Sequence, residues 1–75
     1  MRIEELFSQL LQEPVAAMSD ETSPKTVKQW DSLRHLELVM ALEETFGVTF
    51  SAAELTALSS LGAARRLLAQ KGAPV

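Results

Sequence analysis

Between Ser32 and Phe46 the apolar residues recur every three or four positions, and this spacing constrains the fold more than any other feature of the chain. Such spacing is typical of an amphipathic α-helix. Asp31 and Ser32 both suit the cap position at the start of a helix. Gly47 favours the left-handed conformation that often ends one. The sequence therefore predicts a helix over residues 32–46.

Three more helices are predicted, one before this segment and two after it. The first should end by the residue before Pro14, because proline disfavours the helical conformation in its predecessor. Ser51 and Glu54 have the spacing of a capping box at the start of a short third helix, and Ser59 or Ser60 can cap a fourth. The apolar residues expected on these three helices are Ile3, Leu6, Phe7, Leu10, Leu11, Leu55, Leu58, Leu61, Ala64, Leu67 and Leu68.

Residues 14–31 lack helical periodicity, apart from a possible turn just after Pro14, and include the loop-forming run Ser-Asp-Glu-Thr-Ser-Pro. Long loops in short chains are commonly functional or packed onto the fold. The residues expected to anchor this one are Val15, Met18, Val27 and Trp30. The sequence thus predicts an all-α fold, a small four-helix bundle with a long first loop and a short third helix.

Length and composition favour one soluble domain over residues 1–75, with 47% hydrophobic and 23% charged residues. The absence of cysteine and the single histidine exclude a disulfide framework and argue against a metal centre. No apolar run is long enough to span a membrane, and acids interrupt the N-terminal apolar pattern, unlike in a secretory signal. We expect a cytoplasmic monomer, and Met1 together with the KGAPV end favours a discrete protein.

The helix over 32–46 has two apolar faces, although one would suffice for folding. Leu38, Val39, Leu42 and Phe46 form an ordinary core stripe. The second face, here called the docking face, consists of Leu33, Leu36, Glu37, Met40 and Glu44. Carboxylates among leucines and a methionine suit neither a buried nor a fully solvated surface. This face predicts a partner that is apolar in the middle and basic at the rim, although Leu36 could equally pack under the first loop.

Asp31-Ser32-Leu33 opens this helix at one end of the docking face. The free N–H groups and the dipole at a helix N-terminus favour a phosphate attached to or bound beside a serine there. A net charge of −3 argues against nucleic acid as the partner and fits a basic protein surface.

Over nearly its whole length the chain resembles the acyl carrier proteins. The resemblance lies in Asp31-Ser32-Leu33 joined to the run LELVMALEETFGV, and in the order of helices and loops. It implies that a phosphopantetheinyl transferase attaches 4'-phosphopantetheine from coenzyme A to Ser32, flanked by Asp31 and Leu33, and that acyl groups are held as thioesters on the arm. It also implies that Leu33, Glu37, Met40 and Glu44 meet basic patches of acyl-loading and acyl-processing enzymes of fatty-acid, polyketide or related pathways.

Some positions depart from the family pattern. Arg34 stands where an acidic or neutral residue is usual, and it reduces the negative charge nearest the arm. Trp30 replaces a small residue, and the Gly-Gly pair of peptidyl carriers is absent. The form Trp-Asp-Ser-Leu resembles discrete carriers of specialised pathways, so an aminoacyl or peptidyl-type carrier is an alternative.

The same residues bear on three other functions. Asp31, Ser32 and His35 supply the residue types of a hydrolytic triad, but their spacing on one helix does not suit its geometry. A DNA-binding domain would need a basic stripe that the chain lacks. The third is a non-carrier interaction module, in which Ser32 serves only as a helix cap.

Overall fold

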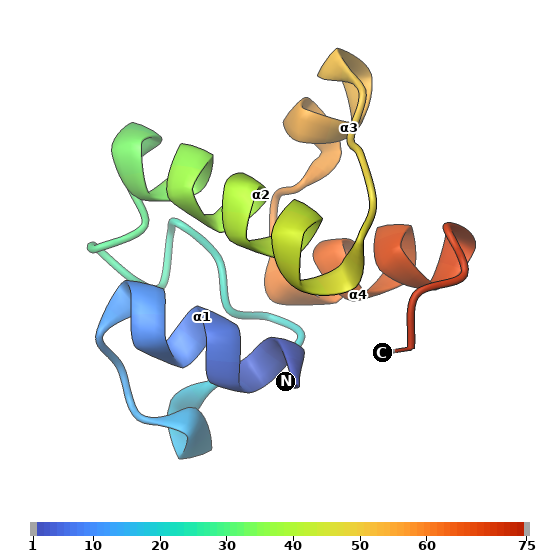
Figure 1. Cartoon of the computed structure of the whole chain (residues 1–75). Coiled ribbons are helices and arrows are strands. Elements are labelled where there is room, and N and C mark those ends of the chain that lie inside the picture. The colour runs from blue at the N-terminus through green and yellow to red at the C-terminus, as the bar shows by residue number, and fades with distance from the viewer. Residues whose placement is uncertain (1, 75) are drawn as a thin grey trace.

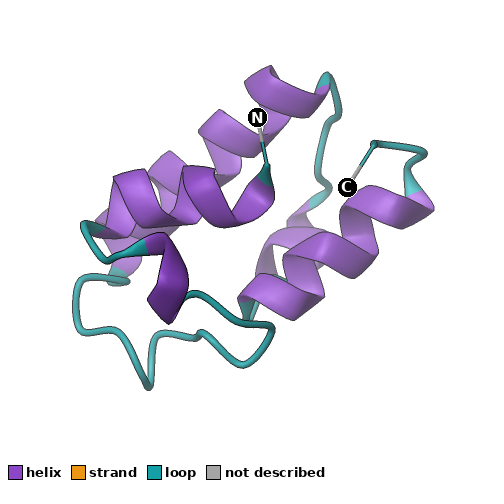
Figure 2. Ribbon diagram, turned by 90° about the horizontal axis from the view of Figure 1, so that it is seen from below, coloured by secondary structure: helices purple, strands orange, loops and turns teal. Residues whose placement is uncertain are grey.

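The computed structural model describes residues 2–74, so Met1 and Val75 of the predicted domain lie outside it. The elements in chain order are α1 (Ile3–Leu11), the single 3₁₀ turn η1 (Val15–Ala17), α2 (Ser32–Phe46), α3 (Ala52–Ala57) and α4 (Leu61–Gln70) (Figure 1). Figure 2 shows only helices and loops in the described part of the chain. The predicted all-α bundle, with its long first loop and short third helix, is therefore confirmed.

The local signals read from the sequence explain where these helices begin and end. The Asp31 side chain accepts a hydrogen bond from the Arg34 N–H at 2.9 Å and caps α2. Gly47 ends α2 in the left-handed conformation, with φ at 65° and ψ at 38°. Ser51 and Glu54 form the predicted capping box of α3.

The core lies between the helices and the long first loop, and α1 and α2 lie side by side across it (Figure 1). Leu38, Val39 and Leu42 of α2 are buried as predicted, while Phe46 is half-buried against the same core. The remaining buried apolar side chains are Ile3, Leu6, Phe7, Leu11, Met18, Val27, Trp30, Phe50, Leu58, Leu61, Ala63, Ala64 and Leu68. Packing of these side chains leaves the docking face of α2 to solvent.

The first loop is packed onto the bundle by three of its four predicted anchors. Met18, Val27 and Trp30 are buried. Val15 is 45% exposed, so its prediction as an anchor was wrong. Val15 begins the three-residue turn η1, which has no buried side chain. A turn this short makes no continuous apolar stripe, and Met18 at its end takes the inward position instead.

The loop is also joined to the start of α4 by its backbone. Leu61 N–H donates to the Thr22 carbonyl at 2.9 Å, and Gly62 N–H donates to the Asp20 carbonyl at 3.0 Å. A Cβ at Gly62 would lie 2.9 Å from that carbonyl oxygen, so the close approach requires glycine. Thr22 is buried beside these contacts. These bonds hold the loop that leads into Ser32.

Among the described residues, three ion pairs join α4 and Lys71, the residue after it, to the rest of the bundle. One of them is formed by Arg65 with Asp20 of the first loop, at 3.2 Å. Arg65 pairs with Glu4 of α1, and Lys71 pairs with Glu54 of α3 at 2.8 Å. The hydrogen bond from Arg65 lowers the pKa of Glu4, and Glu4 in turn raises the pKa of Arg65. The hydrogen bond from Lys71 likewise lowers the pKa of Glu54. Both carboxylates therefore favour the folded state while they are ionised.

Within residues 2–74, no helix is both long enough and apolar enough to cross a membrane. The same residues contain no cluster of histidine, aspartate or glutamate side chains that could hold a metal ion.

Candidate functional site

Ser32 is the first residue of α2, and its side chain is exposed. The sequence offered both Asp31 and Ser32 as caps, and the structure assigns that role to Asp31. The interpretation of Ser32 as a cap is therefore wrong. Since Asp31 already accepts the Arg34 N–H, the Ser32 hydroxyl is not needed to close the helix start.

The backbone around Ser32 suits a phosphate group. The first amides of any helix lack partners in the preceding turn. At α2 Asp31 satisfies the amide of Arg34, and the Asp31 carbonyl satisfies that of His35 at 2.8 Å. In the described chain, no acceptor is found for the amides of Ser32 and Leu33. A phosphate oxygen at the Ser32 side chain can accept from this end of the helix.

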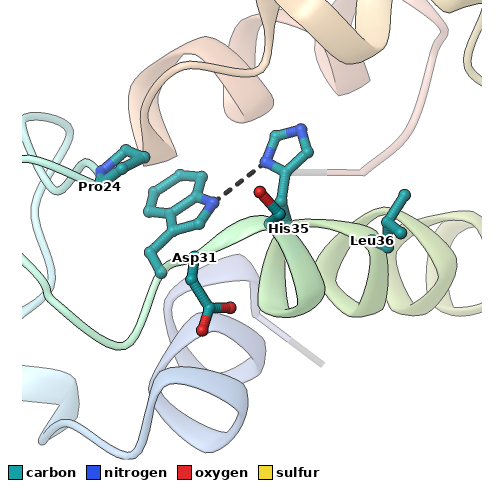
Figure 3. A pocket seen from close by; sticks show the side chains of 6 residues that line it. Pro24, Asp31, His35 and Leu36 are labelled. Carbon is teal, nitrogen blue, oxygen red and sulfur yellow. Dashed lines mark hydrogen bonds between the residues drawn. The ribbon is translucent and has the colours of Figure 1, made fainter.

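Trp30 and His35 form a fixed pair on the inner side of this helix start. The Trp30 indole N–H donates to His35 Nδ1 at 3.0 Å, shown as the dashed line in Figure 3. The two rings are stacked with their centroids 6.1 Å apart. On its other side Trp30 meets Phe7 of α1 edge-on, with centroids 5.4 Å apart. The residue before Asp31 is thus held by the core.

His35 also connects α2 to α3, because its Nε2 lies 3.1 Å from the Leu55 carbonyl oxygen. A carbonyl can only accept, and Nδ1 already accepts from Trp30, so the proton belongs on Nε2. His35 is therefore held as the neutral tautomer with both ring nitrogens engaged. The sequence does not indicate these two partners, because they depend on the packing of three segments.

This arrangement does not support a hydrolytic triad. Neither ring nitrogen of His35 is available to Ser32. The carboxylate of Asp31 points away from the imidazole in Figure 3 and caps the helix instead. A triad requires the base to contact the nucleophile and to be oriented by the acid, and these three side chains do neither.

An open groove adjoins Ser32 and has a volume of about 530 Å³. Its walls come from the first loop and from the first turns of α2. We call it the Ser32 groove. It is lined by Pro24, Trp30, Asp31, Ser32, His35 and Leu36. Its lining is mostly apolar, and the attachment residue predicted from the sequence is part of its wall.

The docking face is present as predicted. Leu33, Leu36 and Met40 are 65%, 57% and 62% exposed. The alternative in which Leu36 packs under the first loop is therefore wrong. Glu44 is exposed as well, and Glu37 is half-buried. Three large apolar side chains on one exposed stripe, flanked by acids, form the composition expected of a protein-binding surface.

One charge on this face is already partly neutralised within the chain. Arg34 Nη1 lies 2.9 Å from Glu37 Oε1, one turn along α2. A partner that uses a lysine or arginine to meet Glu37 must compete with Arg34. Glu44 has no ion-pair partner among the described residues. The sequence indicated the charge of Arg34, whereas its pairing with Glu37 follows from the geometry of the helix.

Comparisons with known proteins show the family to which the chain belongs. A family model described as "Phosphopantetheine attachment site" matches residues 2–68. The chain is 34% identical over 70 residues to a protein of Streptomyces avermitilis named Polyketide-8 synthase acyl carrier protein 2. That alignment covers 93% of this chain and 80% of the relative. Both matches include the start of α2.

Proposed function

Because the chain belongs to the family defined by the phosphopantetheine attachment site, we propose that it is an acyl carrier protein with 4'-phosphopantetheine attached to Ser32. One observation carries the choice of residue. Ser32 is exposed at the first position of α2, and Asp31 rather than Ser32 caps the helix. Its hydroxyl is therefore free to be modified without loss of the cap.

The chain's own residues present the attachment point. Asp31 caps the helix through its carboxylate, while the amides of Ser32 and Leu33 favour the phosphodiester. The attached arm supplies the thiol on which acyl groups are carried, since the chain has no cysteine. With His35 engaged at both nitrogens, no free imidazole lies beside Ser32 to act as a base, and the proposal assigns catalysis to the partner enzymes.

The docking face is the proposed meeting point with those enzymes. Its exposed leucines and methionine offer apolar contact, and Glu37 and Glu44 favour basic patches at the rim. The proposed partners are the phosphopantetheinyl transferase and acyl-loading and acyl-processing enzymes. The name of the Streptomyces relative favours polyketide-type biosynthesis. An aminoacyl-type carrier and a cytoplasmic location stay predictions, as do monomeric behaviour and the single domain.

The exposure of Leu33, Leu36 and Met40 also favours a second candidate function. A helical interaction module would use the same docking face without modification of Ser32. The two functions differ in one measurable property, which is whether Ser32 accepts the arm.

Intact mass spectrometry tests this difference. The unmodified protein is incubated with coenzyme A and a broad-specificity phosphopantetheinyl transferase, alongside Ser32→Ala and the control Ser19→Ala, which removes an exposed loop serine. We expect the parent and Ser19→Ala to gain one phosphopantetheine and Ser32→Ala to gain none. No gain in folded, initially unmodified parent protein would overturn the carrier function and leave the interaction module. A gain in Ser32→Ala would place the attachment elsewhere.

A further inference from the structure

Ser32 is itself part of the groove wall, so any group attached to its hydroxyl starts inside the Ser32 groove. We propose that this groove binds the pantoyl part of the arm, the segment next to the phosphate that carries two methyl groups on a quaternary carbon. The proposal rests on attachment at Ser32. It makes the root of the arm an ordered part of the protein surface.

The walls of the groove suit such an apolar, branched group. Pro24 approaches from the first loop, and Leu36 stands on α2 one turn beyond Ser32 (Figure 3). Trp30 forms part of the wall and is only 4% exposed, so its ring is held firmly by the core. Leu36 is 57% exposed and has apolar surface left to cover. Covering such surface with methyl groups is favourable.

Asp31 is the one carboxylate among the residues that line the groove, and it is engaged in capping α2. Both nitrogens of His35 are engaged, with Trp30 and with the Leu55 carbonyl. The Asp31 carboxylate accepts from Arg34 and points away from the His35 ring (Figure 3). Because His35 is held by hydrogen bonds at both nitrogens, the groove is formed before the arm arrives, and binding requires little reorganisation.

The tether decides which group occupies the groove. A group joined to Ser32 is present at a high effective concentration beside the wall. Along the arm, the methyl-bearing carbon is separated from the phosphate by a single methylene, whereas the thiol and any acyl cargo lie at the far end. The pantoyl unit therefore reaches the groove first. A volume of about 530 Å³ lies within the range of small-molecule sites.

The experiment is nuclear Overhauser spectroscopy on protein that carries the arm but no acyl group, with complete loading verified by intact mass. We expect cross-peaks from the pantoyl methyl protons to the Trp30 ring and to the Leu36 methyls. The chain has one tryptophan, so the ring signals are unambiguous. Absence of these cross-peaks in fully loaded protein would overturn the groove proposal. Failure to load at all would instead overturn attachment at Ser32.

Substitutions in the groove and outside it test whether the cross-peaks depend on the groove walls. Pro24→Ala and Leu36→Ser each remove an apolar wall, and we expect each to weaken the cross-peaks to Trp30 at least two-fold. Val15→Ser is the matched control, since Val15 is an exposed apolar side chain outside both the groove and the docking face. Undiminished cross-peaks in both groove variants, or an equal loss in Val15→Ser, would contradict the assignment. All samples are compared at complete loading, so a slower transferase reaction does not affect the result.

Discussion

At the scale of single residues, two tasks at the start of α2 are divided between the adjacent residues Asp31 and Ser32. Asp31 performs the structural task by capping the helix, and Ser32 is left for the modification proposed above. If one residue served both purposes, attaching the arm would remove the cap and destabilise the helix that presents it. The adjacent pair avoids this conflict.

This division predicts opposite stability effects for two alanine substitutions. Asp31→Ala should lower the free energy of unfolding by about 1 kcal/mol, because an amide at the helix start loses its acceptor. Ser32→Ala should change it by less than about 0.5 kcal/mol, because an exposed residue that is not the cap is replaced by a good helix former. Urea unfolding followed by circular dichroism measures both. A larger loss in Ser32→Ala than in Asp31→Ala would show that serine is the cap.

Trp30 and His35 show how the surroundings restrict a single residue. A histidine near a serine on a helix suggests a base, yet here the imidazole accepts from an indole and faces a carbonyl. The same two contacts give the Ser32 groove a rigid wall. His35 is thus a structural residue beside the proposed attachment residue.

At the scale of the element, α2 packs against the core with one face and leaves the other face, the proposed partner surface, exposed. Leu38, Val39 and Leu42 are buried, while Leu33 and Met40 are exposed. Leu36 lies where the docking face meets the Ser32 groove. An enzyme bound to the docking face would therefore lie next to the root of the arm.

The Arg34–Glu37 pair on α2 predicts how charge affects docking. Arg34→Gln leaves the Glu37 carboxylate without its ion-pair partner. A basic partner can then pair with that carboxylate, and it meets one positive charge fewer on the docking face. We expect the KM of the phosphopantetheinyl transferase for the protein to fall about two- to five-fold at low salt, which corresponds to roughly 0.4–1 kcal/mol for a surface charge pair. Salt should reduce the difference, because it screens exposed charges.

Arg66→Gln is the control for this prediction, because Arg66 is an exposed residue of α4. Each substitution changes the net charge from −3 to −4 by removing one positive charge. An equal fall in KM for both variants would assign the effect to net charge rather than to the docking face. A rise in KM for Arg34→Gln would show that Arg34 itself contacts the partner.

At the scale of the whole molecule, the long first loop is as much a part of the bundle as the helices. Its buried anchors and its backbone bonds to α4 place Trp30 and Asp31 at the start of α2. The ion pairs of Arg65 with Glu4 and of Lys71 with Glu54 connect α4 to α1 and α3. Stability of the site therefore depends on contacts far from Ser32.

These ion pairs predict a loss of stability in acid. The pKa values of Glu4 and Glu54 are lowered in the folded protein from an ordinary value of 4.5. The stability they contribute is complete above the unfolded pKa and is lost as pH falls through the folded pKa. We expect the free energy of unfolding, measured in urea, to decrease as pH is lowered below about 4.5.

Glu4→Gln tests the source of this acid dependence. It should flatten the decrease below pH 4.5, because a neutral side chain has no charge to lose there. Glu21→Gln removes an exposed carboxylate outside these ion pairs and should leave the slope nearly unchanged. Equal slopes for the parent and both variants would show that the Glu4 pair contributes nothing to acid stability.

The sequence by itself determined the helices, the core stripe of α2 and the residues of the docking face. These features depend on neighbours three or four positions apart, such as Ser51 with Glu54, whose interactions arise within one helix turn. Attachment at Ser32 still awaits its experiment. The family itself is established, because the match covers most of the chain.

Only the tertiary structure decided which of two adjacent residues caps α2, that Val15 is exposed, and where both nitrogens of His35 find partners. It also brought Pro24 and Leu36 into one groove with Ser32 and bonded Thr22 to Leu61. Each of these contacts depends on how separate segments pack, and local periodicity contains no information about segments that are distant along the chain. The helices follow from local chemistry, whereas the groove beside Ser32 exists because the loop folds back onto them.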